Sequence, residues 1–97
     1  MKRISFTWDA GKNSTNITKH GVSFEEAQSV FYDDNARVMF DPVHSEDEDR
    51  FIILGLSERL HILVVCHCYK ENEGMIRIIS ARKATKNEKK QYGECIK

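Results

Sequence analysis

Three apolar stretches follow one another closely in the second half of the chain, and they constrain the fold most. They span residues 50–56, 61–69 and 75–82 and are rich in β-branched side chains. The polar segments that separate them are short enough to be hairpin loops, so we expect an antiparallel meander. Because each stretch is apolar at both odd and even positions, we expect the centre of a sheet that is covered on both faces, at least in the assembled state.

The first third of the chain predicts one strand and two helices. Residues 4–8 alternate between apolar and polar and are typical of a short strand. Asp9 is the expected cap of a helix that runs to His20, with Gly21 directly after its end, although the middle of this helix is rich in poor helix formers. Ser23 and Glu26 match a capping box that opens a second short helix.

The remaining elements complete an α+β pattern. Residues 37–41 form a further expected strand, and Thr85 with Glu88 matches a second capping box. This box opens a short C-terminal helix that we expect to stop at Gly93. The predicted fold class is therefore α+β: a short N-terminal strand, two helices, an antiparallel four-strand meander-type sheet and a short C-terminal helix, all in one domain over residues 1–97.

Composition narrows the class of protein. The N-terminus has no apolar stretch typical of a signal peptide, and no apolar run is long enough to span a bilayer, so we expect a cytoplasmic protein without a membrane partner. The net charge of zero hides an asymmetry. Residues 33–49 hold seven acids against one arginine, whereas residues 75–97 hold seven bases against two acids. Such a chain can bind a polyanion at its basic end and a basic partner at its acidic end, or the two charged faces can simply be solvated.

The segment Cys66-His67-Cys68 is the most conspicuous candidate metal site in the sequence. The acidic run at residues 46–49 could supply carboxylates for Mg²⁺ but is more typical of solvated charge. On a strand, the two cysteines share a face and zinc would need two more ligands from elsewhere. Buried thiols explain the cysteines more simply, so we expect no metal site, and we expect no cofactor because the usual nucleotide-binding motifs are absent. A zinc-dependent enzyme built on this segment stays an alternative.

Metal-free cleavage of RNA is the chemistry that the remaining residues allow. Arginines can hold the scissile phosphate but are poor general acids, because their pKa exceeds about 12. Protons must then be moved by other side chains, and the candidates are His67, His20, His44, Glu48 and Lys19. Strand alternation places Arg77 and Arg82 on opposite faces unless a bulge intervenes. Arg82 is favoured for catalysis because it lies at the strand end, before Lys83 and a capped helix, whereas Arg77 is expected to support a surface or to contact RNA. If the last hairpin pairs His67 opposite Arg77, those two share a face.

Several blocks of the sequence resemble the BrnT toxin family. They are Trp8-Asp9, the block Lys-His-Gly-Val-Ser-Phe-Glu-Glu-Ala over residues 19–27, the segment from Asp41-Pro42 to Arg50, and Ile-Arg-Ile-Ile-Ser-Ala-Arg over residues 76–82. The resemblance covers nearly the whole chain in order. It implies a RelE-like fold and a toxin of a type II toxin–antitoxin system, which acts as a ribonuclease on mRNA and inhibits translation.

The resemblance also implies partners and site residues. The implied partner is a BrnA-like antitoxin of the ribbon-helix-helix class, through which alone the complex binds operator DNA. The residues that match the family's functional positions best are Arg82 and Arg50, and His67 and Glu48 are weaker catalytic candidates. Lys19, Arg77 and Lys83 are the expected RNA-binding residues. The alternative function is a non-catalytic module that binds RNA or protein.

Overall fold

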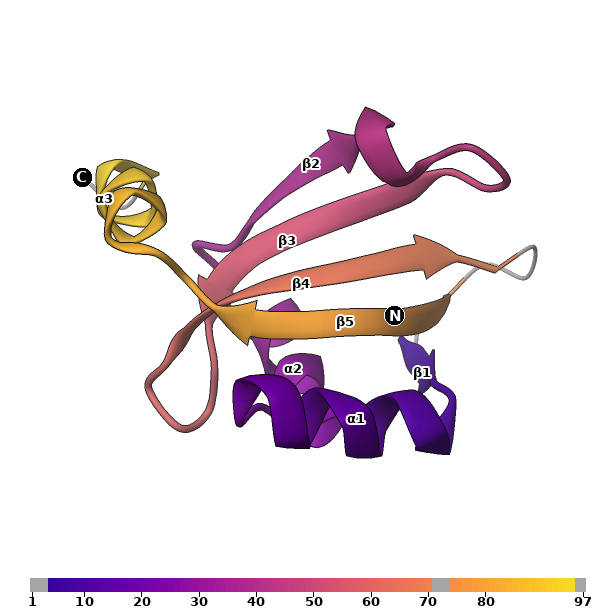
Figure 1. Cartoon of the computed structure of the whole chain (residues 1–97). Helices are drawn as coiled ribbons and strands as arrows, with labels where there is room; N and C mark the ends of the chain where they lie inside the picture. Colours follow the sequence, from indigo (N-terminus) through magenta and orange to yellow (C-terminus); the bar gives the residue numbers. More distant parts are fainter. Residues whose placement is uncertain (1–3, 71–73, 96–97) are drawn as a thin grey trace.

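The computed structural model describes residues 4–70 and 74–95. Its centre is a five-stranded sheet in the order β1-β5-β4-β3-β2 (Figure 1). The strands are β1 (Ser5–Thr7), β2 (Arg37–Asp41), β3 (Arg50–Leu56), β4 (Ile62–Tyr69) and β5 (Met75–Lys83).

The last four strands form the expected antiparallel meander, but the sheet is larger than expected. β1 joins it as a fifth strand and runs parallel to β5, with Phe6 opposite Ile76. The prediction of a four-stranded antiparallel sheet was therefore wrong. The alternation of residues 4–8 indicates a strand, but it contains no information about which neighbour that strand pairs with.

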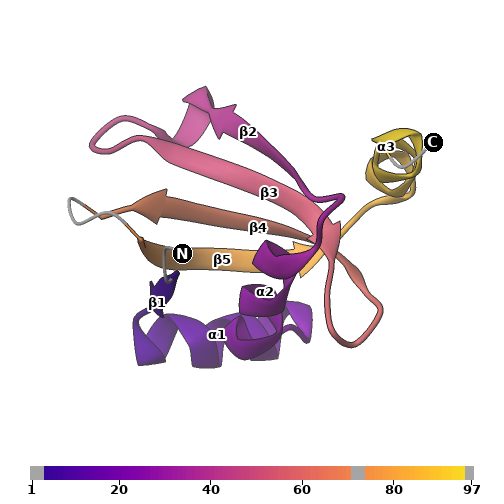
Figure 2. The ribbon, with the colours of Figure 1, turned by 180° about the vertical axis from the view of Figure 1, so that it is seen from behind.

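Two helices cover one face of the sheet. They are α1 (Ala10–His20) and α2 (Phe24–Ser29), and a 3-10 turn, η1 (Val30–Tyr32), follows α2 directly. Figures 1 and 2 show them against the β5 side of the sheet, with β2 at the opposite edge. A second 3-10 turn, η2 (Pro42–His44), follows β2, and α3 (Lys86–Cys95) lies beyond the end of β5.

The first helix is stabilised at its ends and in its middle by specific contacts. Oδ1 of Asp9 accepts a hydrogen bond from the backbone N–H of Lys12, and Gly21 adopts a left-handed φ of 69° after the last turn. Asn16, a poor helix former, is buried, and its side-chain amide exchanges two hydrogen bonds with the backbone of Ala81 in β5 (2.7 and 3.1 Å). Asn16 thus pairs with part of the β5 edge that β1 does not reach.

The capping box of the second helix is only half formed. Oγ of Ser23 accepts a hydrogen bond from the backbone N–H of Glu26 (3.1 Å), as expected. The Glu26 carboxylate turns instead to the β3–β4 turn, where it accepts from Ser57 (2.7 Å) and lies 2.8 Å from His61. Burial raises the pKa of Glu26, but these hydrogen bonds outweigh it, so that the net pKa lies below the ordinary value.

The core between the helices and the sheet is compactly packed. Its buried residues are Val22, Phe24, Ala27, Val30, Ile53, Leu63, Val65, Ile78 and Ala81. Gly55 in β3 allows η1 to approach closely, because a Cβ there would lie 2.8 Å from Cγ1 of Val30.

Among the residues that the structure describes, the other face of the sheet is covered only at one end, by α3. Tyr92 packs there against Leu54 and Val64, and its hydroxyl donates a hydrogen bond to Oδ2 of Asp33 (2.7 Å). The expectation of two covered faces is thus only partly correct. α3 also continues through Gly93, because a glycine permits a helix to end but does not require it. Within the described ranges, none of the helices combines the length and the apolar character needed to cross a bilayer.

Candidate active site on the uncovered face

A β-bulge in β5 determines which side chains share the uncovered face. Cys66 of β4 pairs with Ser80, whereas the next residue, His67, pairs with Ile78, so that Ile79 is an extra residue in β5. The extra residue reverses the alternation of side chains along β5. Arg77, opposite Cys68, and Arg82, opposite Val64, therefore lie on the same face, and the predicted separation of the two arginines by strand alternation was wrong.

His67 lies on the opposite, helix-covered face. It is fully buried, and its ring packs edge-on against Phe31 at a centroid distance of 4.8 Å. Burial lowers the pKa of His67 and favours the neutral ring. Of the registers that the hairpin length left open, the structure has His67 opposite Ile78, and Arg77 lies on the other face, so His67 is not brought to the arginines.

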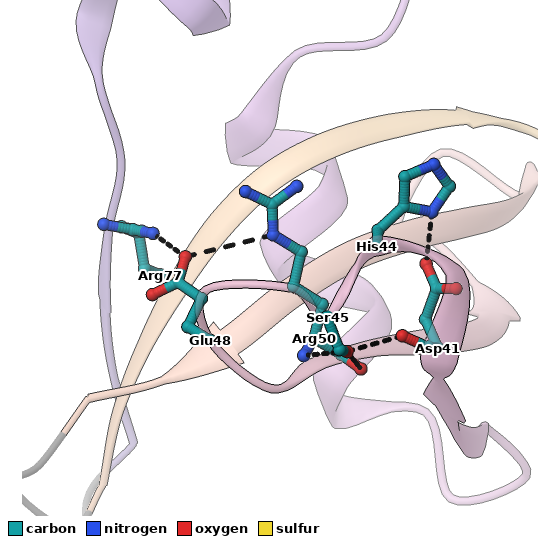
Figure 3. A network of polar contacts seen from close by, with 6 residues as sticks. All are labelled: Asp41, His44, Ser45, Glu48, Arg50 and Arg77. Atoms are coloured by element: carbon teal, nitrogen blue, oxygen red, sulfur yellow. Dashed lines mark hydrogen bonds and ion pairs between the residues drawn. The ribbon is translucent and has the colours of Figure 1, made fainter.

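Arg50 joins the two arginines from the start of β3. Glu48 lies between Arg77 and Arg50: its Oε1 accepts a hydrogen bond from Arg77 and is 3.9 Å from Nε of Arg50 (Figure 3). The Nε atoms of both arginines are buried and have no hydrogen-bond partner among the described residues. Glu48 thus holds two guanidinium groups close together, where their charges would otherwise repel.

The turn between β2 and β3 adds a histidine that is paired with a carboxylate. Nδ1 of His44 lies 2.8 Å from Oδ2 of Asp41 (Figure 3). Because an ionised carboxylate only accepts hydrogen bonds, Nδ1 carries the proton and Nε2 is left as the basic nitrogen. Ser45 fixes the turn: its hydroxyl donates to the backbone oxygen of Asp41 (2.5 Å) and accepts from the backbone N–H of Arg50 (2.9 Å).

These groups surround a hollow of about 210 Å³ on the uncovered face. His44 and Arg50 line it from the turn and β3, Ser80 and Arg82 line it from β5, and His20 reaches it from the end of α1. The hollow brings together phosphate-binding groups and groups able to move a proton.

Arg82 is already ion-paired with α3. Its two terminal nitrogens donate to the two carboxylate oxygens of Glu88 at 2.7 and 2.9 Å. Glu88 also accepts from the backbone N–H of Thr85, which completes the predicted capping box. The hydrogen bonds from Arg82 are the largest cause of a Glu88 pKa of about 2, well below its ordinary value.

This ion pair predicts a dependence of stability on pH. The lowered pKa of Glu88 means that its contribution is fully present above pH 4.5 and is lost as the pH falls towards 2. We expect Glu88→Gln to lower the free energy of unfolding by about 1 kcal/mol at pH 7, because the partly exposed pair is screened by solvent. Thermal unfolding should show this difference narrowing below pH 4.5. Glu94→Gln, at an exposed position of the same helix, should not change the pH dependence.

The two predicted RNA-binding lysines lie in different places. Lys19 of α1 is exposed and borders a groove beside His20 and Ser80. Lys83 is opposite Leu63, on the face that the helices cover. Of the two, only Lys19 is near the hollow.

The sequence alone did not single out His44 and Asp41. In the sequence, His44 is one of several possible proton carriers, and Asp41 is part of a family-like block without any assigned role. The available signal was the Asp-Pro-x-His spacing, since a turn that starts at a proline brings residues three apart together.

The Cys66-His67-Cys68 segment does not form a cluster of ligands. The two cysteines share the uncovered face, whereas His67 lies on the other. Burial raises the pKa of Cys66 and disfavours its thiolate. Among residues 4–70 and 74–95, no three His, Cys, Asp or Glu side chains are arranged to hold a metal ion.

Comparisons with known proteins point to one family. The profile of the ribonuclease toxin BrnT of type II toxin–antitoxin systems matches residues 8–88. Among solved structures, the crystal structure of the Brucella abortus ribonuclease toxin BrnT is similar, with a TM-score of 0.65 and 26% sequence identity, over 86% of this chain and 99% of that chain. The search of curated proteins gave no match. The family profile covers most of the sequence and the structural match has the same fold, so the chain belongs to the BrnT family of ribonuclease toxins of type II toxin–antitoxin systems.

Proposed function

We propose that this toxin cleaves mRNA in the cytoplasm, without a metal ion, at the hollow on the uncovered face of its sheet, and thereby inhibits translation. The observation that carries the proposal is the bulge at Ile79, which puts Arg77 and Arg82 on the face that also holds Arg50. Three guanidinium groups on one face are suited to an RNA backbone, because each binds phosphate oxygens through two or more N–H donors.

The arginines would hold the scissile phosphate and stabilise the charge that develops on it. Arg50 and Arg82 line the hollow, whereas Arg77 lies beside it and would contact a neighbouring phosphate. Glu48 and Glu88 keep the arginines in place before RNA binds, and a phosphate then competes with these carboxylates. In this proposal Glu48 is a positioning residue and does not transfer protons.

His44 is our candidate for proton transfer in place of His67. Nε2 of His44 would take the proton of the ribose 2′-hydroxyl as the 2′-oxygen attacks phosphorus. The bond between phosphorus and the 5′-oxygen breaks, the departing oxygen takes up a proton, and the products are a 2′,3′-cyclic phosphate and a 5′-hydroxyl. Asp41 would position His44 by accepting the hydrogen bond from Nδ1.

Membership of the family implies an antitoxin as partner. We propose that this antitoxin is a BrnA-like ribbon-helix-helix protein and that the toxin meets operator DNA only through it. We also propose that the α+β fold is of the RelE-like kind. Lys19, beside the hollow, would extend the RNA-binding surface along α1.

The proposal is tested by cleavage of a defined single-stranded RNA in the presence of excess EDTA. We expect full cleavage and fragments that end in a 2′,3′-cyclic phosphate, because all the groups needed are side chains of the protein. Loss of cleavage with EDTA, and its recovery with added Mg²⁺, would contradict the metal-free mechanism. Salt-sensitive binding of the RNA without any fragments would support the alternative of a non-catalytic module instead.

A further inference from the structure

The two edges of the sheet differ in how well they are covered. At one edge, the edge strand is the short β1 (Ser5–Thr7), which pairs with Met75–Arg77 of β5, and the side chain of Asn16 pairs with the backbone of Ala81 further along. At the other edge, β2 pairs with β3 on its inner side, and no strand of the described residues pairs with its outer side (Figures 1 and 2). An open edge strand is a ready template for strand pairing with another chain.

The side chains of β2 are apolar and exposed on both faces. Val38 and Phe40, opposite Ile53 and Phe51, are 48% and 50% exposed, and Met39, on the other face, is 37% exposed. Natural edges are usually protected by charged side chains, prolines or bulges. In β2 the charged residues are at the two ends, Arg37 and Asp41, and Pro42 follows, whereas residues 38–40 between them are all apolar. A helix packed on one face of β2 would leave the residues of the other face exposed, either Met39 or the pair Val38 and Phe40. A strand added to the edge has side chains on both faces and can cover all three. The exposed apolar residues therefore favour a strand as the partner element.

The charges around β2 indicate which charge the partner strand should carry. Exposed carboxylates lie on both sides of β2: Asp34 precedes it, and Glu46, Asp47 and Asp49 follow it. β2 itself begins with the exposed Arg37, so its far end is the more acidic one. In an antiparallel pairing with a second copy, Arg37 of one copy would lie near Asp41 of the other, but Asp34 and the carboxylates of residues 46–49 would leave an excess of negative charge at both ends, which is unfavourable. A strand with lysine or arginine at one end would be attracted to the carboxylates that follow β2.

We propose that the outer edge of β2 is the docking site for the protein partner of this toxin, which adds a sixth strand with alternating apolar side chains and a basic flank beside residues 46–49. The inference rests on the proposed function in so far as it takes a type II toxin to have a protein partner. β2 ends at Asp41, which pairs with His44, so a strand docked there lies next to the proposed active site. Occupation of the edge and access of RNA to the hollow are thereby coupled.

The test compares two variants that place a lysine at an exposed apolar position. Val38→Lys adds a charge to the edge that blocks pairing and repels a basic strand. Leu60→Lys makes the same change in the β3–β4 turn, where the side chain is 78% exposed. The probe is the antitoxin encoded beside the toxin gene, purified and titrated by calorimetry. We expect Val38→Lys to weaken binding at least about tenfold and Leu60→Lys to leave it within about twofold.

Hydrogen exchange of the wild-type complex gives a second measurement. We expect backbone amides of β2 to become protected when the antitoxin binds, since strand addition gives them new acceptors. Equal affinities of the two variants, or unchanged exchange in β2, would overturn the inference. It would also be overturned if light scattering showed that the toxin alone is a dimer which Val38→Lys dissociates, because the occupant would then be a second copy.

Failure of the docking site and failure of the proposed function remain distinguishable. RNA cleavage by Val38→Lys is measured without antitoxin and should equal that of the wild type, because Val38 is not part of the hollow. If the wild-type protein cleaves no RNA, the proposed activity is wrong, while the comparison of the two affinities still decides the docking edge.

Discussion

Replacement of Arg82 by alanine is expected to lower the rate of RNA cleavage by about 10²–10³-fold, the loss typical of removing one donor that stabilises charge in the transition state. Arg82 lines the hollow, and the bulge at Ile79 turns it onto the face that holds Arg50. The measurement is single-turnover cleavage of a defined RNA, with circular dichroism to show that the protein stays folded.

The matched control for this prediction is Glu88→Gln. Both variants break the ion pair between Arg82 and α3, but only Arg82→Ala removes the guanidinium. We expect Glu88→Gln to retain cleavage, because the freed guanidinium no longer shares its donors with a carboxylate. An equal loss of activity in the two variants would show that Arg82 acts only by holding α3 in place, and would remove it from the proposed active site.

Replacement of His44 by alanine has the second large expected effect, a loss of about 10²–10⁴-fold in cleavage, as is usual for a general acid or base. His44 is 63% exposed, so its removal should change stability little. Asp41→Asn should lower cleavage as well, because an amide can stabilise the wrong tautomer of the imidazole. An RNA substrate with a better leaving group than a 5′-hydroxyl should recover part of the activity if His44 also protonates that oxygen.

The variant His67→Leu distinguishes the assignment of proton transfer to His44 from the catalytic role of His67 that the sequence suggested. Leucine fills much of the same buried space between Phe31 and Phe51, on the face away from the hollow. We expect cleavage per folded molecule to stay near that of the wild type, while the stability changes through packing. If His67→Leu abolished cleavage and His44→Ala did not, the assignment of proton transfer to His44 would be wrong.

Local signals in the sequence predicted most of the elements. The cap at Asp9, the left-handed Gly21 and the strand Arg37–Asp41 agree with the structure, because each depends on neighbouring residues in the chain. The capping box at Ser23 was predicted only in part. The carboxylate of Glu26 has a choice between its own helix end and the distant Ser57 and His61, and local sequence does not decide between them.

The site was harder to predict, since strand alternation is reliable only where the strand is regular. Along β5 it put Arg77 and Arg82 on opposite faces, and along β4 it allowed His67 to lie near Arg77. One extra residue, Ile79, reverses both conclusions. No local signal marks Ile79 as the bulged residue, because isoleucine is equally suited to a regular strand.

The sequence by itself therefore determined the family, the α+β class and the kinds of groups available for chemistry, because motifs and periodicity are properties of consecutive residues. Only the tertiary structure decided which of those groups meet. The pairing of β4 with β5 brought Arg77 and Arg82 together, the turn at Pro42 joined His44 to Asp41, and Asn16 closed one edge of the sheet while β2 left the other open. The physical reason is that each of these outcomes depends on the register and packing of segments that are distant in the chain, and so on interactions that no local pattern contains.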